Sequence, residues 1–392
     1  MKVLLVSHEL SVTGAPNSLL RQAGYFKSAG FDVEVWTLAD GPLRVRYEAA
    51  GFSPEVVPNN RQAILGRFAK THVCYDLVVC NTIRTYRAVD VFRRQDLKVA
   101  WFVRETLLLD EDWWLNPDFA DVFAGFGNLY TVSEYAADVV RRYNPHVRVI
   151  HNSVADVFRG FAPLGRSVRF GFIGSIIPAK GIDVLLDAFA DVRLKFPAAT
   201  LTIAGGSARD DFERLRAQTA GEPSVRWVGQ VQADDKQSFF DSIDVLCVPS
   251  LDEPSGLTVI EGAMQGKAVI TTDRTGANYL VDSTCGRIVR AGDRRSLAEA
   301  LSELAGAGAK VLWELGHSAR ARYLRLGTPA EERAAVLRMV EECRAEPPVR
   351  TPLRDDSAKP LFHVTRYLDG RCRVYFRGLR LFSFRGKGVS RR

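Results

Sequence analysis

Short apolar runs alternate with longer stretches of helical periodicity along most of the chain. The first run, KVLLVSH at residues 2–8, ends at a polar loop, and a helix-like segment at 17–30 leads to a second run, FDVEVWT at 31–37. Continuous apolar runs are typical of parallel strands that are buried on both faces. The opening residues therefore predict a strand, a glycine-containing loop, a helix and a second strand, in a βαβ unit.

The same pattern continues through both halves of the chain. In the first half, further runs occupy residues 55–58, 76–81, 99–104, 129–133 and 148–152. After a segment with glycine and proline at 159–167, the pattern starts again, with runs at 168–175, 201–206, 225–230, 244–250, 268–272 and 286–290. This alternation predicts two doubly wound α/β domains, whose ligands bind at the carboxyl ends of the strands. We place the first domain at 1–158, a linker at 159–167 and the second domain at 168–345.

The last residues, 355–392, differ in kind. Asp369–Gly370 lies between two β-like runs, and LRLFSFR follows a glycine, which together predict a small basic and aromatic β-meander. The segment holds ten Lys or Arg and three Asp, so it accounts for the whole net charge of +7. The charge therefore describes a tail and does not indicate a body that binds nucleic acid. Two roles are favoured for 361–392 and are compatible with each other: sealing its apolar side against the body, and docking on an anionic membrane surface. Nucleic-acid binding is a third and less favoured alternative.

Composition narrows the class of protein. With 392 residues, 46% hydrophobic and 25% charged, the chain has room for two globular cores. Its six cysteines form no C-x-x-C pair, which argues against a metal site or a disulfide framework. The N-terminal apolar run is too short for a signal peptide, and no stretch approaches the roughly 18 apolar residues of a spanning helix, so we expect a cytoplasmic protein. The first loop lacks G-x-G-x-x-G, so a dinucleotide cofactor is poorly supported.

The clearest chemistry lies in EPSGLTVIEGAMQGKAVITT, at residues 253–272. Glu253 and Glu261 stand eight positions apart, with Gly256 between them at the expected start of a helix. Carboxylates accept hydrogen bonds from paired hydroxyl groups, and the N–H groups of a helix start hold an anion. The arrangement therefore suits a polyhydroxylated ligand that carries a phosphate. The alternative is a solvated acidic loop followed by a surface helix.

A second stretch, IGSIIPAKG at residues 173–181, has the pattern of a phosphate-binding loop. A strand ends at Gly174, a loop crosses, and Lys180 stands just before a predicted helix. Such a loop can cradle a diphosphate, with Lys180 as a point positive charge. The alternative is a solvated lysine at a helix start. In the first half, the candidates at strand ends are His8, Gly14, Arg104 and Glu105. The alternative for His8 is a capping role, and the alternative for Arg104 and Glu105 is a simple ion pair.

These motifs resemble a known family. The order of strand, Pro-Ser, Glu253, Gly-Leu and Glu261-Gly resembles the E-x7-E signature of retaining, two-domain nucleotide-sugar glycosyltransferases, the broad glycosyltransferase family 4. Residues 173–181 resemble its Gly-Arg-x4-Lys-Gly pattern, except that Ser175 stands where Arg is usual, so one cation is absent from that position. The loop before Ala15 resembles the family's double glycine, with Thr13 in place of the first. The resemblance covers roughly residues 1–345.

The resemblance implies a GT-B architecture, in which two Rossmann-like domains face a cleft. It implies that Glu261 binds the ribose hydroxyls of the nucleotide, that Glu253 holds hydroxyls of the donor sugar, and that Lys180 neutralises the leaving diphosphate. The remaining donor-binding candidates are Gly14, Gly174, Ser175, Ser255, Gly256 and Leu257, and the candidates for the acceptor or sugar side are His8, Arg104 and Glu105.

The implied activity is retaining transfer of a hexose or deoxyhexose from a nucleotide sugar to a glycan or lipid-linked acceptor in cell-surface polysaccharide synthesis. The acceptor hydroxyl would attack from the front face, without a protein nucleophile. No D-x-D motif lies in a convincing loop, so we expect no metal, and the nucleotide sugar is a substrate, so no cofactor. Ser175 keeps open a non-catalytic protein that binds nucleotide sugar or glycan; a nucleotide-sugar epimerase is a third alternative. The protein would lie in the cytoplasm, with the tail as a peripheral contact to the inner face of the membrane.

Overall fold

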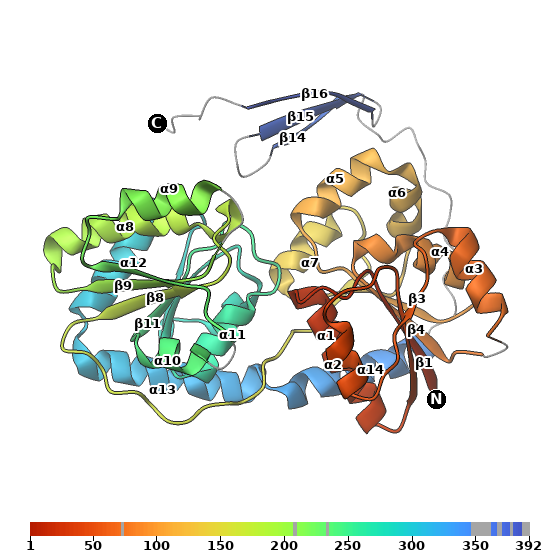
Figure 1. Cartoon of the computed structure of the whole chain (residues 1–392), viewed down its shortest axis with the longest axis horizontal. Coiled ribbons are helices and arrows are strands. Elements are labelled where there is room, and N and C mark those ends of the chain that lie inside the picture. The colour runs from red at the N-terminus through yellow and green to blue at the C-terminus, as the bar shows by residue number, and fades with distance from the viewer. Residues whose placement is uncertain are drawn as a thin grey trace. The chain divides into compact units, whose positions relative to one another are not determined.

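The computed structural model describes residues 1–71, 74–206, 210–232, 235–345, 362–366, 371–376 and 379–385. The chain divides into two compact units, which we call unit 1 (Met1–Ile150 with Glu332–Arg392) and unit 2 (His151–Glu331). Each unit is built around one parallel sheet, and a separate three-stranded sheet follows near the C-terminus (Figure 1). The predicted doubly wound α/β architecture is confirmed.

Unit 1 has a seven-stranded parallel sheet in the order β3-β2-β1-β4-β5-β6-β7. Its strands are β1 (Lys2–Ser7), β2 (Asp32–Thr37), β3 (Glu55–Val56), β4 (Leu77–Asn81), β5 (Val99–Phe102), β6 (Leu129–Thr131) and β7 (Val147–Val149). The helices of its first segment, Met1–Ile150, are α1 (Gly14–Ser28), α2 (Arg44–Ala49), α3 (Arg61–Ala69), the 3-10 turn η1 (Ile83–Thr85), α4 (Tyr86–Arg94), α5 (Leu107–Leu115), α6 (Pro117–Ala124) and α7 (Glu134–Arg141). The strand order reverses between β1 and β4, which is where such sheets bind ligands.

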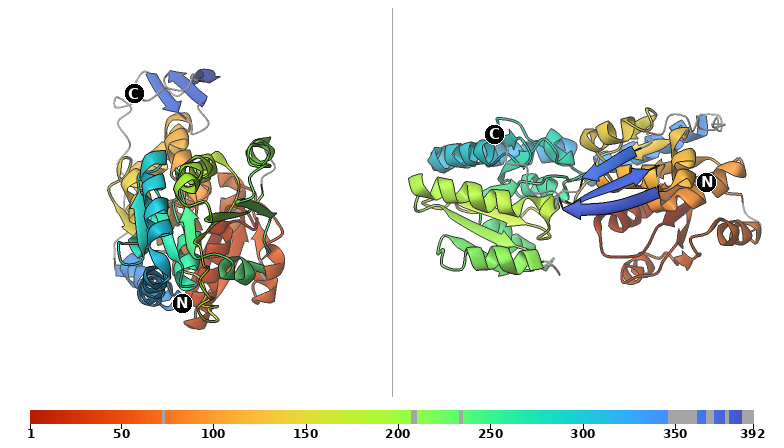
Figure 2. Two further views of the ribbon diagram at one scale, coloured as in Figure 1. Left: turned by 90° about the vertical axis from the view of Figure 1, so that its left-hand side faces the viewer. Right: turned by 90° about the horizontal axis from the view of Figure 1, so that it is seen from above.

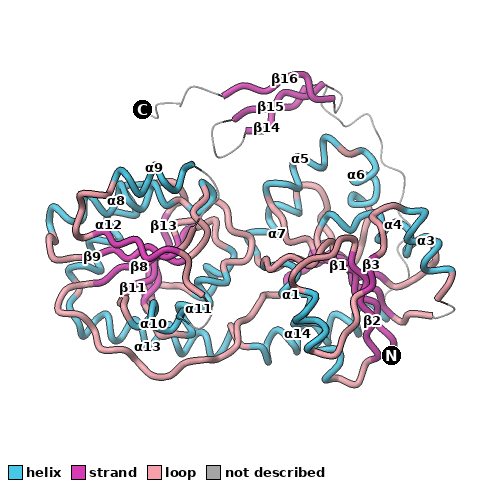
Figure 3. The backbone as a smooth tube through the Cα atoms, in the orientation of Figure 1, coloured by secondary structure: helices cyan, strands magenta, loops and turns pink. Residues whose placement is uncertain are grey.

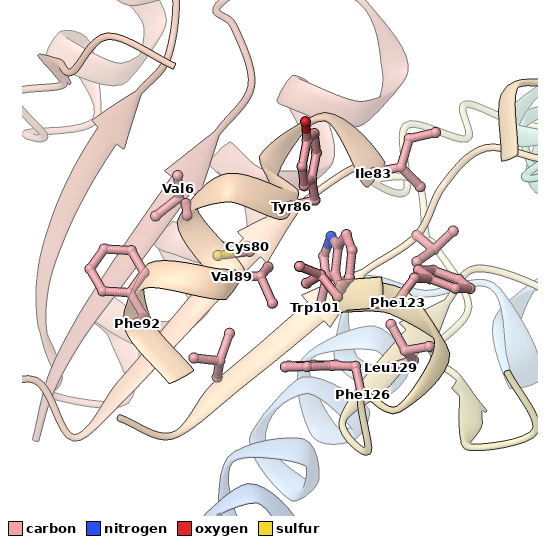
Figure 4. Packing of buried hydrophobic residues seen from close by; sticks show 14 of the residues in the cluster. Val6, Cys80, Ile83, Tyr86, Val89, Phe92, Trp101, Phe123, Phe126 and Leu129 are labelled. Carbon is pink, nitrogen blue, oxygen red and sulfur yellow. The ribbon is translucent and has the colours of Figure 1, made fainter. Parts of the chain in front are cut away.

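Side chains of the unit 1 strands alternate between two buried cores, as the two-residue period of a strand requires. Val6, Cys80 and Trp101 belong to one core, in which the Trp101 ring lies edge-on to Phe123 and Phe126 at centroid distances of 5.4 and 5.6 Å (Figure 4). The opposite face contributes Val3, Leu5, Val79 and Phe102 to the second core. Both faces of the sheet are therefore covered, which explains the uninterrupted apolar runs in the sequence.

Helix α14 (Pro329–Ala345) packs on the second core of unit 1. Its buried residues are Val336, Met339, Val340 and Cys343. Buried Glu332 accepts hydrogen bonds from Arg21 Nε at 2.6 Å and from the Tyr25 hydroxyl at 3.2 Å. We expected the second domain to extend to residue 345. The structure instead assigns the chain from Glu332 to unit 1, because these contacts join α14 to α1.

Unit 2 repeats the same plan with six parallel strands in the order β10-β9-β8-β11-β12-β13. They are β8 (Arg169–Ile173), β9 (Thr200–Ala204), β10 (Val225–Gly229), β11 (Val245–Val248), β12 (Ala268–Thr272) and β13 (Gly286–Val289). The described helical segments are η2 (Pro178–Lys180), α8 (Ile182–Lys195), α9 (Asp210–Gln218), α10 (Lys236–Asp241), α11 (Leu257–Met264), η4 (Gly276–Leu280), α12 (Arg294–Gly306) and α13 (Gly308–Leu326). Figure 3 shows the strands of each unit gathered between helices, and the order of unit 2 reverses between β8 and β11.

The segment that follows Ile150 belongs to unit 2. The Tyr323 hydroxyl donates to the carbonyl of Val154 at 3.0 Å, and Arg320 pairs with Asp156 at 2.6 Å. Phe161 stacks on His317 with ring centroids 3.6 Å apart. We expected the first domain to continue to residue 158 and a linker at 159–167. The structure differs, since these contacts hold the segment on α13 and place the unit boundary at His151.

The C-terminal sheet is an antiparallel meander of β14 (Phe362–Arg366), β15 (Arg371–Phe376) and β16 (Leu379–Arg385). Its three strands are drawn in blue in Figure 2. The predicted β-rich tail is thus confirmed, while the predicted turn at Asp369–Gly370 lies outside the described residues. Within the part of the chain that the structure describes, every helix is too short or too polar to cross a membrane.

Candidate functional site

Unit 2 holds a cavity of about 580 Å³ where β8, β9 and β10 end. The sequence candidates Gly174, Ser175 and Glu261 all line it. The other lining residues are Ile173, Gly205, Gly206, Gln230, Val231, Lys236 and Thr258. The cavity therefore lies at the carboxyl edge of the sheet, where doubly wound folds bind their ligands, and its size fits a small organic ligand.

The charged residues of this cavity form an ion pair. Glu261 projects from α11, and its Oε1 accepts from Lys236 Nζ of α10 at 2.6 Å. Opposite charges cancel within the cavity, so an anionic ligand would not meet an uncompensated carboxylate. Lys236 was missed in the sequence, because no motif marks it and the pair spans 25 positions.

Close backbone packing shapes the floor of the cavity. Gly205, which follows β9, has φ +148°, and a Cβ atom there would lie 1.9 Å from the carbonyl oxygen of Gly174. Only glycine fits this approach. Ser175 also lines the cavity, and its side chain carries no charge. Lys236 supplies a cation to the same cavity.

Lys180 and Glu253 form a second ion pair in unit 2. Lys180 ends the turn η2, in the connection after β8, and Glu253 lies in the loop after β11, so the pair forms at the reversal of strand order. The backbone of Glu253 is fixed because its N–H donates to Arg274 O at 3.0 Å and its carbonyl accepts from Gly276 N at 2.8 Å. Burial lowers the pKa of Lys180 to about 8, and the charge of nearby Asp252 acts in the opposite direction.

The start of α11 is held in place by the same loop. The N–H of Gly256 donates to Glu253 Oε1 at 3.1 Å, and Gly256 adopts φ +75° directly before Leu257, where the helix begins. The Ser255 hydroxyl accepts from Asn152 Nδ2 at 2.7 Å. The first N–H groups of a helix have no partner within it, so α11 offers donors beside Glu253.

The unit 1 candidates lie where β1, β4 and β5 end. Arg104, which is buried, donates from Nε to Asn81 Oδ1 at 2.5 Å, and its guanidinium lies 4.9 Å from the Phe102 ring centroid. Burial lowers the pKa of Arg104 to about 10. Glu105 accepts through Oε2 from the N–H groups of Ile83 at 3.2 Å and Arg104 at 2.9 Å, and burial raises its pKa.

His8 and Gly14 lie in the connection that follows β1. Burial lowers the pKa of His8, which favours a neutral imidazole that can accept a hydrogen bond, and its Nε2 lies 3.6 Å from Glu9 Oε1. Gly14 is the exposed first residue of α1, and a Cβ atom there would meet no other atom within 4 Å. At Gly14 the structure therefore leaves space beside the backbone.

Thr82, directly after β4, was missed in the sequence. It has φ +79°, a strained conformation for a β-branched residue. Its carbonyl accepts from Trp101 Nε1 at 2.8 Å, so the unit 1 core holds this conformation in place. No sequence signal would have found it, because β-branched residues rarely adopt a positive φ.

Comparison with known proteins agrees with this arrangement. Residues 1–119 match the model of the glycosyltransferase family 4 domain, and residues 167–306 match that of glycosyl transferases group 1. Among solved structures, HepE from Anabaena in complex with UDP is 18% identical, with a TM-score of 0.75, and covers 87% of this chain and 100% of its own. The lipopolysaccharide outer core galactosyltransferase WaaB is 14% identical, with a TM-score of 0.71, and covers 87% and 99%.

Curated relatives match over shorter stretches. The phosphatidyl-myo-inositol mannosyltransferase of Mycobacterium leprae is 36% identical over 162 residues, which is 40% of this chain and 42% of that protein. The lipopolysaccharide core biosynthesis glycosyltransferase LpsE of Rhizobium meliloti is 28% identical over 134 residues, or 34% and 38%. The chain thus aligns with about two fifths of the length of these relatives.

Two parallel α/β units with candidate residues at their strand ends define the GT-B class of fold. The chain belongs to the family 4 type of glycosyltransferases within that class.

Proposed function

We propose that this protein is a retaining glycosyltransferase that moves a sugar from a nucleotide-sugar donor to a glycan or lipid-linked acceptor. The observation that carries the proposal is that unit 2 contains two charged features at the carboxyl edge of its sheet. One is the cavity lined by Lys236 and Glu261, and the other is the ion pair of Lys180 and Glu253 at the reversal of strand order. The family match and the UDP in the HepE complex support a nucleotide-sugar donor.

In the proposed reaction, Glu261 accepts hydrogen bonds from the ribose hydroxyls, and Glu253 binds hydroxyls of the donor sugar. Cleavage of the anomeric C–O bond leaves negative charge on the diphosphate and builds positive charge on the sugar ring. The Lys180 ammonium and the first N–H groups of α11 stabilise the former, which is the main electrostatic contribution. The acceptor hydroxyl attacks from the side of the leaving group and passes its proton to an oxygen of the departing diphosphate, so the anomeric configuration is retained. The proposed reaction needs no metal ion.

The acceptor side of the proposal rests on unit 1 and on the relatives. His8 follows β1, and Arg104 and Glu105 follow β5, with β4 between the two strands; a neutral His8 could accept a hydrogen bond from an acceptor hydroxyl. Relatives named for phosphatidyl-myo-inositol and for lipopolysaccharide core favour an acceptor of cell-surface glycolipid or polysaccharide synthesis. We accordingly propose a cytoplasmic site of action.

A panel of nucleotide sugars tests the activity. Release of nucleoside diphosphate with an acceptor present supports transfer, and an isomerised sugar would indicate an epimerase. Ser175, which leaves its position without the usual cation, favours a binding-only protein as the second candidate. Donor binding in a thermal-shift assay, without turnover of any donor in the panel, would replace the enzyme proposal with that candidate.

Replacing Glu261 with alanine should weaken binding of the preferred nucleoside diphosphate by about 1–3 kcal/mol, because a charged hydrogen-bond acceptor is lost. The variant also leaves Lys236 without its carboxylate partner, which offsets part of the loss for an anionic ligand. Isothermal titration calorimetry measures the change, with Glu299→Ala on the exposed surface of α12 as the control. Equal affinities of the Glu261→Ala protein and wild type, with both folded, would exclude a nucleotide-binding role for Glu261.

The pH dependence of activity should report on Lys180. Because burial places its pKa at about 8, the ammonium is present below that pH and is lost as the pH rises through it. We therefore expect kcat/KM for the donor to fall above about pH 8, since this parameter reports ionisations of the free enzyme. In Lys180→Arg the guanidinium stays charged, so any remaining activity should lack this decline. If kcat/KM declines with the same midpoint in wild type and in Lys180→Arg, the decline belongs to another ionisable group.

A further inference from the structure

The register of the C-terminal sheet sorts its residues onto two faces of different chemistry. Residues directly opposite each other in an antiparallel pair share a face, and neighbours along a strand alternate. Val364 pairs with Val374, and Val374 pairs with Phe382, so these positions fall on one face. The same face includes the positions of Phe362, Phe376 and Phe384, and also Arg366, which pairs with Cys372 at the end of β14. The pairing thus collects the phenylalanines of the sheet on one side.

The opposite face is basic. Arg371 pairs with Arg385, and Tyr375, two positions beyond Arg373, pairs with Arg380 after a register shift. These four arginine positions therefore share a face. The sequences of the three strands contain no aspartate or glutamate. The face carries concentrated positive charge without an acidic residue in its own strands.

Like charges placed directly opposite each other destabilise an antiparallel pair, as the Arg371–Arg385 register does. An apolar sheet face is stable when it is buried against other protein. If the phenylalanine face is covered in this way, the basic face is the one that remains for a partner. Arginine binds phosphate oxygens through two parallel hydrogen bonds. The partner that offsets the repulsion is therefore an extended surface of phosphate groups.

We propose that the basic face of this sheet docks on the anionic phospholipid surface of a membrane. A nucleic acid also presents phosphates, but proteins that bind single strands stack bases on aromatic residues beside the positive charge. Here the register places all four phenylalanines of the sheet on the face opposite Arg371, Arg373, Arg380 and Arg385, and Tyr375 is the one Phe, Tyr or Trp position of the three strands on the basic face. The inference goes beyond the proposed transfer reaction and concerns a separate part of the chain, so either can fail alone.

The test uses the full-length protein and two variants with equal loss of charge. Arg373→Ser with Arg380→Ser removes two charges from the basic face, and Lys387→Ser with Arg391→Ser removes two charges that lie outside the three strands. Co-sedimentation with phosphatidylglycerol–phosphatidylcholine vesicles measures binding. Each basic residue near an anionic surface contributes enough that the first variant should bind about tenfold or more weakly. The second should lose distinctly less.

Binding should also weaken between about 0.1 M and 1 M salt, as the screening length falls from about 10 to 3 Å. Equal losses in the two variants would overturn the face assignment, because binding would then follow total charge. A Phe382→Ser, Phe384→Ser protein that loses binding while the Arg373→Ser, Arg380→Ser protein keeps it would show that the apolar face is the membrane contact. Tighter binding to a fluorescent oligonucleotide than to anionic vesicles would replace lipid with nucleic acid. Nucleoside diphosphate affinity, measured in parallel, should be unchanged in the arginine variant.

Discussion

Lys180→Ala should lower kcat by about 10²–10³-fold, the loss typical when one preorganised group that stabilises transition-state charge is removed. The Lys180 ammonium lies at the reversal of strand order in unit 2, in contact with Glu253. In the proposed reaction, diphosphate charge develops at this place. Because burial already lowers the pKa of Lys180, an approaching diphosphate would stabilise the charged form. Negative charge on the diphosphate grows as the anomeric C–O bond breaks, so the effect should fall mainly on turnover rather than on donor affinity.

Steady-state kinetics on folded variants measure this effect, and Lys310→Ala on the exposed surface of α13 is the matched control. Glu253→Gln keeps the size of the side chain but removes its charge, and it should lower kcat by more than about tenfold. The double variant should lose less than the product of the two single losses, because the two side chains are in contact. Turnover within twofold of wild type for both single variants would contradict the assigned roles.

Trp101→Ala should reduce the free energy of unfolding of unit 1 by about 3–5 kcal/mol, as expected when a large aromatic side chain is removed from a packed core. Trp101 is 0% exposed and contacts the rings of Phe119, Phe123 and Phe126. Its Nε1 also donates to the carbonyl of strained Thr82. The substitution therefore leaves a cavity and frees the turn beside the unit 1 candidate residues.

Native-state hydrogen exchange of the β4 and β5 amides measures this loss within unit 1, even where the two units do not unfold as one. Trp313→Ala makes the same chemical change on α13 of unit 2, where the tryptophan is 53% exposed; exchange of the β11 and β12 amides should show a cost of about 1 kcal/mol or less in that unit. Trp101→Phe should lie between them, because it keeps an aromatic ring but loses the hydrogen bond to Thr82. A loss below about 1 kcal/mol in Trp101→Ala would show that this core relaxes around the cavity.

Much of the molecule was determined by local sequence. Every predicted apolar run of the two α/β domains overlaps a strand, since a strand buried on both faces needs uninterrupted apolar residues. The spacing of Glu253 and Glu261 placed one carboxylate before the N-terminus of α11 and the other on it, because a loop and a short helix are local structures. The three-stranded tail also followed from alternation within a few residues, and its charge can be read directly from the sequence.

Contacts between distant residues were decided by the tertiary structure alone. The register of the tail strands determined which face carries Arg371, Arg373, Arg380 and Arg385, since a shift by one residue would have exchanged the faces. Lys236 reaches Glu261 because α10 and α11 both line the same cavity. Helix α14 joins unit 1 through the hydrogen bond from Arg21 to Glu332, which lie 311 positions apart. Thr82 adopts its strained φ because the core around Trp101 holds it. Local sequence preference contains none of these pairings, because each depends on how the sheets bring separate segments together.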